Sequence, residues 1–199
     1  MLNFFQRIFL VTFNPEEFFE QVREDKSWLR PICHLLGLSF LLAAASVIAW
    51  GAGMPGDTPV NASLGAQMDI YPFWRDTLLP QYNFLAYPMA IGLIMLEMII
   101  ISAIWIPILF VVFHYLGGAK ESWKVGLLHA VQGFIYGLSP CVLGGYIPYL
   151  ALLVGVYATI LQFFRGPAIT LRNKSFVPYL FLALFLAFVI LRYWQGALL

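Results

Sequence analysis

The sequence predicts an all-α membrane protein, in which five transmembrane helices form a bundle and an amphipathic interfacial helix precedes them. Hydrophobic residues make up 61% of the chain and charged residues 11%, and the mean hydropathy is +0.83. Apolar runs of about eighteen residues or more are long enough to cross a bilayer. These runs use nearly all of the chain, so we expect no separate soluble domain. The expected spans cover residues 31–50, 86–113, 123–144, 147–165 and 176–194.

Residues 1–30 are expected to form a cytoplasmic segment before the membrane domain of residues 31–199. Residues 1–13 are apolar but too short to span, and they lack the basic start and cleavage site of a signal peptide. Asn-Pro-Glu-Glu at 14–17 is typical of a helix start. The helix that follows carries apolar residues on one side, namely Phe18, Val22 and Leu29. It is either an interfacial helix on the membrane surface or a capped lead-in to the first span.

Residues 51–82 are expected to be a loop, because they are rich in Gly, Pro, Asn and Asp. Within this loop Tyr71, Phe73 and Trp74 are typical of an aromatic anchor at the membrane interface. The second span follows, and Pro107 is placed where it could kink the helix near its inner end.

When the residues of the third span are placed around a helix at 100° per residue, they fall into stripes of different residue types. A polar stripe contains His129, Gln132, Tyr136 and Ser139. An adjacent stripe contains only small residues, Gly126, Ala130, Gly133, Gly137 and Cys141. The fourth span has a matching face with Ala151, Gly155, Ala158, Thr159 and Gln162. Because small residues let backbones approach closely, we expect these two spans to form a tight hairpin at the centre of the bundle.

The basic residues predict the orientation of the chain, because they are enriched on the cytoplasmic side of membrane proteins. Nine lie on one side of the expected membrane: Arg7, Arg23, Lys26, Arg30, Lys120, Lys124, Arg165, Arg172 and Lys174. Only Arg75 and Arg192 lie on the other. We therefore expect a cytoplasmic N-terminus and an external C-terminus.

Glu97 is the most unusual residue of the predicted spans, since it lies near the middle of the second one. Ionisable residues at this depth are costly and often functional, which favours an ion- or proton-coupled site. The alternative is a neutral carboxyl group that locks the bundle by hydrogen bonding to Tyr136, Ser139 or Thr159. Together with His129, Gln132 and Gln162, Glu97 could line a polar cavity. Polar side chains on packed helices more often hold helices together.

The sequence gives no support for catalysis, a cofactor or a metal. It contains none of the common hydrolase, metalloprotease, P-loop or dinucleotide-binding motifs. His34 and His114 lie near span ends, where we expect them to be interfacial, and no metal-ligand cluster is apparent. Cys33 and Cys141 are expected at different depths, as free thiols. The net charge of +1 does not favour nucleic-acid binding.

Several segments resemble the prokaryotic branch of the Yip family (Ypt-interacting proteins). Asn-Pro-Glu-Glu-Phe-Phe at 14–19 precedes the first span. The strongest match is Gly-Gly-Ala-Lys-Glu-Ser-Trp at 117–123, followed by Phe-Ile-Tyr-Gly-Leu-Ser-Pro at 134–140 and Tyr-Ile-Pro at 146–148. The resemblance covers about residues 15–194. It implies a five-span, non-enzymatic membrane protein.

Eukaryotic Yip proteins are associated with vesicle transport and Rab-type GTPases. The chain lacks their long cytosolic N-terminal region and their Asp-Leu-x-Gly-Pro element, which puts GTPase binding in doubt and favours a prokaryotic plasma membrane. The first functional hypothesis is therefore a scaffold or adaptor, whose partners are the lipid bilayer and other membrane proteins or a second copy of the chain. The second is a small ion or solute transporter that uses Glu97. Lipid handling by the N-terminal helix is a third.

Overall fold

The computed structural model describes residues 2–53, 70–116, 121–143 and 148–167, and the described residues form helices and turns without a strand. Three helical stretches are long and apolar enough to cross a membrane: Leu29–Gly51, Ile70–Tyr115 and Trp123–Leu143. The all-α prediction is confirmed for the described residues, whereas five spans remain a prediction. The expected fifth span and the turn at 144–147 lie outside the described residues.

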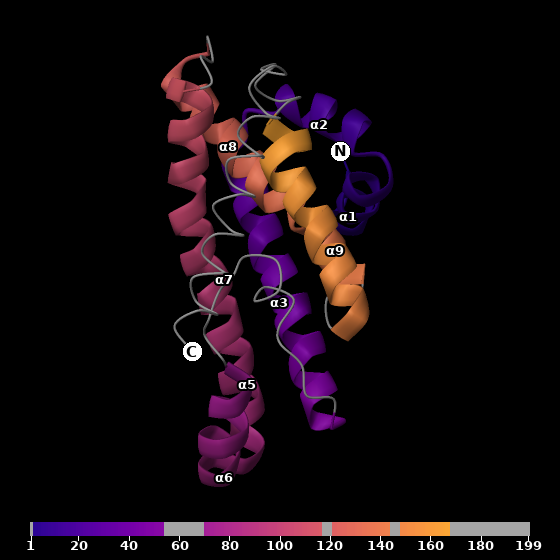
Figure 1. The fold of residues 1–199 in the computed structure, drawn as a ribbon, viewed down its shortest axis with the longest axis vertical. Helices are drawn as coiled ribbons and strands as arrows, with labels where there is room; N and C mark the ends of the chain where they lie inside the picture. The colour runs from indigo at the N-terminus through magenta and orange to yellow at the C-terminus, as the bar shows by residue number, and fades with distance from the viewer. Residues whose placement is uncertain (1, 54–69, 117–120, 144–147, 168–199) are drawn as a thin grey trace, which may run out of the picture.

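Two short helices, α1 (Phe4–Phe13) and α2 (Pro15–Arg23), precede the first long helix α3 (Leu29–Gly51). Asn3 begins α1 with a capping box, in which it exchanges two hydrogen bonds with Gln6 at 2.8 and 2.9 Å. Asn14 marks the boundary between α1 and α2, but its side chain bonds to Glu17 instead of capping a backbone N–H group. Figure 1 shows both short helices in the upper half of the molecule, with α2 nearer its end.

The apolar face of α2 contacts protein, which corrects the expectation that this face is turned to the membrane. Phe18, Phe19 and Val22 are buried in a cluster with Tyr136 and Leu161. The helix therefore neither lies on the lipid by this face nor extends directly into the first span. The chain instead folds α2 back over the centre of the bundle.

The segment before the second span is helical where it is described, which corrects the prediction of a loop. It contains α5 (Ile70–Phe73), a π-helical turn (Trp74–Leu78), α6 (Leu79–Tyr82) and a 3₁₀ turn (Asn83–Leu85). Asn83 has a φ of +48°, a conformation that Asn adopts more readily than most residues. The chain reverses here, so that the Trp74 and Tyr87 ring centroids lie 5.5 Å apart.

The second long helix, α7 (Ala86–Val111), begins where the sequence predicts. It continues past Pro107 and ends in a π-helical turn (Val112–Leu116). The predicted aromatic anchor is divided between two environments, because Trp74 is buried between the ends of α3 and α7 and Phe73 is exposed.

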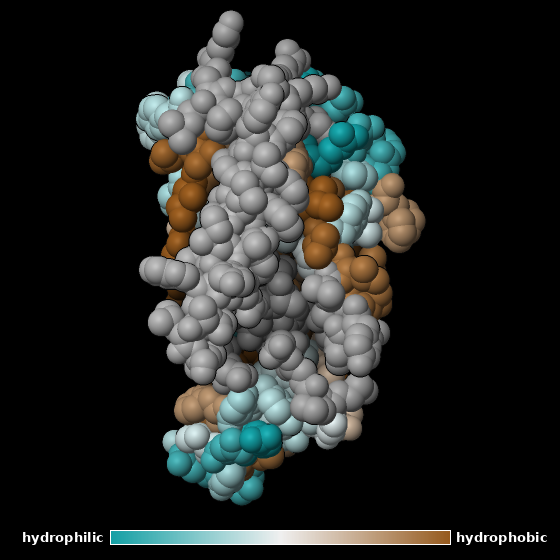
Figure 2. Space-filling view, in the orientation of Figure 1, coloured by the Kyte–Doolittle hydropathy of each residue, from teal (hydrophilic) through white to brown (hydrophobic). Residues whose placement is uncertain are grey.

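The central element is α8 (Trp123–Gly137), continued by a 3₁₀ turn (Ser139–Leu143). In the most apolar 18 residues of the Trp123–Leu143 stretch, 83% of the residues are buried. The corresponding share is 44% in α3 and 28% in the Ile70–Tyr115 stretch. Helix α8 packs against α3, α7 and the segment formed by α9 (Pro148–Ile160) and its π-helical end (Leu161–Arg165). Figure 2 shows hydrophilic surface at the two ends of the molecule and hydrophobic surface between them.

Candidate functional site

Side chains of the polar stripe of α8 contact the end of α2 and the turn that follows it. The His129 ring lies between the Glu121 carboxylate, 3.0 Å from Nδ1, and the Arg23 carbonyl oxygen, 3.3 Å from Nε2. Gln132 Nε2 donates to the Asp25 carbonyl oxygen at 2.8 Å. The last carbonyl groups of a helix lack partners within that helix, so the contact with Arg23 satisfies the end of α2. The contact with Asp25 holds the turn that follows. In its doubly protonated form, His129 donates to both of its oxygen neighbours.

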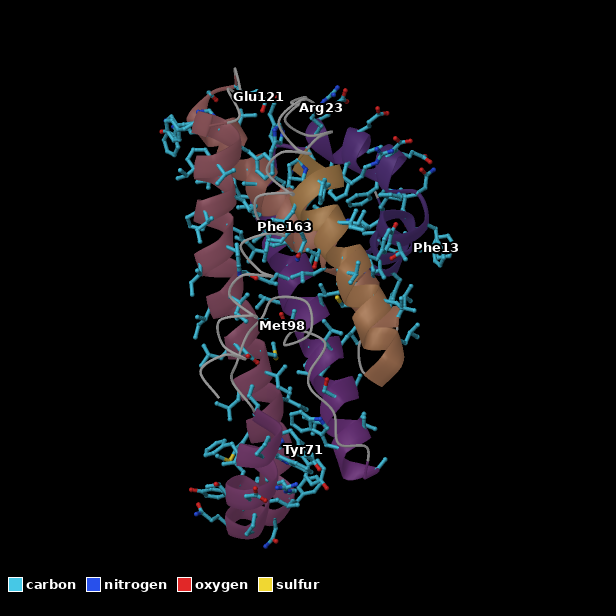
Figure 3. All side chains as sticks on the ribbon, viewed as in Figure 1. Phe13, Arg23, Tyr71, Met98, Glu121 and Phe163 are labelled. Carbon is cyan, nitrogen blue, oxygen red and sulfur yellow. The ribbon has the colours of Figure 1, made fainter. Side chains whose placement is uncertain are left out.

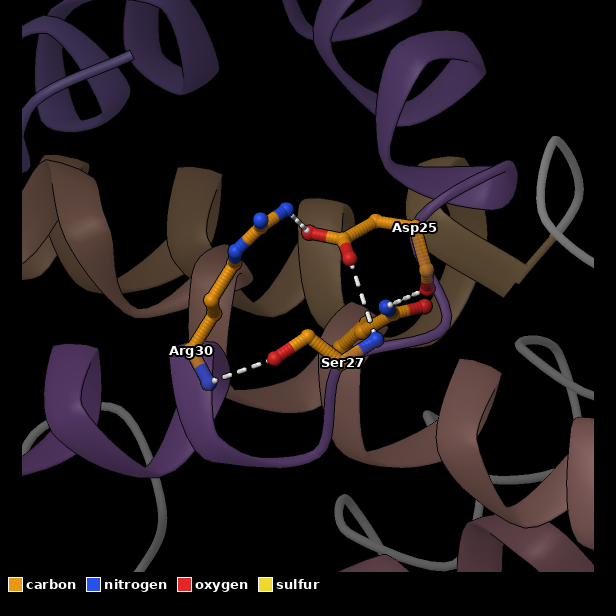
Figure 4. A network of polar contacts seen from close by, with 4 residues as sticks. Asp25, Ser27 and Arg30 are labelled. Atoms are coloured by element: carbon orange, nitrogen blue, oxygen red, sulfur yellow. Dashed lines mark hydrogen bonds and ion pairs between the residues drawn. The ribbon is translucent and has the colours of Figure 1, made fainter. Parts of the chain in front are cut away.

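The turn between α2 and α3 contains a network of polar contacts (Figure 4). Arg30 Nη1 lies 2.6 Å from Asp25 Oδ2, and the other Asp25 oxygen accepts from the Ser27 backbone N–H at 3.0 Å. Ser27 Oγ accepts from the Arg30 backbone N–H at 3.4 Å, in the first turn of α3. The turn thus fixes where α3 begins relative to α8.

The other end of the stripe contacts α3 through His34, a residue that we expected at the interface but that is buried. His34 Nε2 lies 2.9 Å from Ser139 Oγ, and the rings of His34 and Tyr136 meet edge to face at 4.9 Å. A signal for this burial was available in the sequence. His34 shares a helical face with Leu38 and Leu42, which are also buried.

The small residues of α8 pack closely against other segments of the same chain. A Cβ atom on Gly137 would lie 2.9 Å from the backbone nitrogen of Gln162. A Cβ atom on Gly126 would meet the His114 ring at 2.7 Å. Gln162 Nε2 also donates to the Phe134 carbonyl oxygen at 3.3 Å. Other members of the predicted packing face are buried as well: Ala130, Gly133, Cys141 and Gly155.

Glu97 is not hydrogen-bonded to this network. Its side chain is only 4% exposed on α7, and neither carboxyl oxygen has a hydrogen-bond partner among the described residues. None of the three partners that we expected provides one: Ser139 pairs with His34, Tyr136 packs against His34 and Phe18, and the Thr159 hydroxyl donates to the Gly155 carbonyl oxygen. Within the described part of the chain, Glu97 is therefore not hydrogen-bonded to the other five predicted site residues.

The fold and these contacts define an all-helical protein with candidate membrane-spanning helices around a buried, hydrogen-bonded central helix. Within the described ranges no group of three or more His, Cys, Asp or Glu residues could hold a metal ion. Comparison with protein-family models, curated proteins and solved structures finds no match to the chain.

We expect Gln132→Met to loosen the turn after α2, because the Asp25 carbonyl oxygen loses its donor while the side-chain volume is nearly kept. A helix-to-helix hydrogen bond in a membrane protein contributes roughly 0.6 to 1.7 kcal/mol. Trypsin should therefore cleave the native protein after Arg23 or Lys26 several times faster in this variant, as followed by mass spectrometry. Ser102→Ala is the control, because the Ser102 hydroxyl donates to Met98 within its own helix. Equal cleavage rates in wild type and Gln132→Met would contradict the assignment.

Proposed function

We propose that the chain is a non-enzymatic membrane scaffold or adaptor, the role that the resemblance to the Yip family implies. We place it in a prokaryotic plasma membrane, with the N-terminus cytoplasmic and the C-terminus outside. The observation that carries the proposal is that side chains of the polar stripe form contacts within the chain. His129, Gln132 and Ser139 are buried and bond to other parts of the same chain. Side chains engaged in this way hold helices together and do not line an aqueous path.

The face of α7 that points away from α8 supports the proposal, because it offers an apolar surface to other membrane proteins. Its exposed residues are Leu96, Ile99, Ile100, Ile104, Ile108 and Val111. The glycines of α8 already pack against other segments of the chain. This face of α7 is therefore the better candidate for an intermolecular contact.

Site-specific photocrosslinking tests the scaffold. A benzophenone amino acid at Ile104, which is 55% exposed, should give a discrete protein adduct in native membranes. The same amino acid at the buried Ile94 is the control and should give none. An adduct of twice the chain's mass would identify a second copy as the partner. Crosslinks to lipid alone would contradict the scaffold.

A second candidate function is transport of an ion or solute, and Glu97 favours it. A buried carboxyl group without a partner among the described residues is a group that a proton or cation could neutralise. Proton and cation flux into sealed proteoliposomes separates the two functions. The scaffold predicts no flux in either wild type or Glu97→Gln.

Flux in wild type that is lost in Glu97→Gln, at unchanged thermal stability, would establish transport and end the scaffold proposal. If neither protein conducts and the variant differs in stability, Glu97 has a structural role. Measuring flux and stability on the same preparations is essential, because a misfolded variant would also lose flux.

A further inference from the structure

Helix α1 carries apolar residues on two opposite sides. Ile8 and Val11 face the protein and are buried. On the opposite side Phe5, Phe9 and Phe13 recur every fourth residue and are 69%, 64% and 65% exposed. We call these three residues the phenylalanine ridge. A row of exposed aromatic side chains usually marks a surface that meets a membrane or another protein.

The single charged residue of α1 points the other way. Arg7 is half-buried and interacts electrostatically with Tyr136 and His34, which are both buried inside the protein. The polarity of α1 is thus inverted, with its charge toward the bundle and its aromatic rings outward. Hydrocarbon favours this arrangement, because charged side chains within a membrane turn toward the protein interior.

The contacts of α1 also place it beside the candidate spans. The Phe4 ring packs on Gly37 and against His34. Gly37 is eight residues beyond Leu29, the first residue of α3, which is roughly 12 Å along the helix. A contact that far along a membrane span lies within the hydrocarbon core, whose half-thickness is about 15 Å.

The other end of α1 meets α9, where Tyr157 Oη donates to the Thr12 carbonyl oxygen at 2.7 Å. Figure 3 shows Phe13 pointing away from the bundle at this point. The two helices that α1 contacts here, α3 and α9, also expose apolar side chains. These are Ile32, Leu36 and Phe40 on α3, and Leu153, Val156 and Ile160 on α9.

We propose that α1 is embedded in one leaflet of the bilayer without spanning it, with the phenylalanine ridge in contact with lipid acyl chains. The helix is ten residues long, which is too short to cross the membrane. The charged face of α2 then lies at the polar headgroups, and α1 anchors the N-terminal segment below it. The inference holds for a scaffold or a transporter.

Spin-label accessibility in vesicles of phosphatidylcholine and phosphatidylglycerol tests this placement on the full chain. Labels at Phe9→Cys and, independently, Phe13→Cys are compared with a label at Glu20→Cys on the exposed face of α2. All variants carry Cys33→Ala, while Cys141 is buried and remains unlabelled.

We expect dissolved oxygen to relax the labels on α1, and a water-soluble nickel chelate to relax them several-fold less than the label at position 20. Labels on α1 as accessible to nickel as position 20 would place the helix in water and overturn the proposal. Labels inaccessible to both reagents would mean that another protein or a second copy covers the ridge, which would overturn it equally.

Discussion

Gly137→Leu should strongly destabilise the protein, because α8 approaches the π-helical end of α9 most closely at this glycine. A Cβ atom there would lie 2.6 Å from Gln162 Cγ, 2.9 Å from its backbone nitrogen and 3.0 Å from its Cα. Two of these atoms belong to the backbone and cannot rotate away. Overpacking of a rigid site costs roughly 1 to 3 kcal/mol, and we expect the free energy of unfolding to fall by about 3 kcal/mol or more.

The matched control for this substitution is Gly92→Leu in α7. A Cβ atom on Gly92 would meet nothing within 4 Å. Removing a glycine from a helix interior stabilises it by about 0.5 to 1 kcal/mol, so this variant should equal or exceed wild type. Unfolding in mixed micelles with increasing sodium dodecyl sulfate measures both. Equal losses in the two variants would show that the leucine, and not the contact with Gln162, is responsible.

Trp74→Ala should have an effect of similar size at the opposite end of the molecule. Trp74 is 3% exposed, and its ring lies 5.5 Å from Trp50, 6.1 Å from Tyr71 and 5.5 Å from Tyr87, between ring centroids. This aromatic cluster joins the segment before α7 to the ends of α3 and α7. Replacing a buried Trp by Ala costs about 3 to 5 kcal/mol, because the cavity fills only partly.

Phe73→Ala is the control for Trp74→Ala, since Phe73 is the neighbouring aromatic residue and is 47% exposed. We expect it to change the free energy of unfolding by less than about 1 kcal/mol. The Trp74 indole nitrogen has no hydrogen-bond partner among the described residues, so the difference between the variants reports packing. If both aromatic residues act as an interfacial anchor, the two substitutions should cost the same.

Several features could be predicted from the sequence because they depend on local chemistry. The apolar runs predict α3 and α7 to within two residues at their N-terminal ends, and Asn14 marks the boundary between α1 and α2. The periodic sorting of α8 indicates that its sides have different environments. It is the most buried of the three candidate spans.

Other features depended on contacts between distant segments. The helical segment at 70–82 exists because the turn at Asn83 returns Trp74 to α3 and α7. His34 is buried because α8 supplies Ser139 and Tyr136 as neighbours. Neither contact has a local signature, since each joins residues that no short pattern relates.

The sequence by itself determined that the chain is helical, that its helices are apolar enough for a membrane, and which faces differ. Only the tertiary structure decided what each face meets. It placed Phe18 and Val22 of α2 against protein and left the phenylalanine ridge of α1 exposed. It also left Glu97 without a hydrogen bond to the polar stripe among the described residues. The physical reason is that lipid and protein interior are both apolar, so hydrophobic periodicity identifies a face without distinguishing its neighbour.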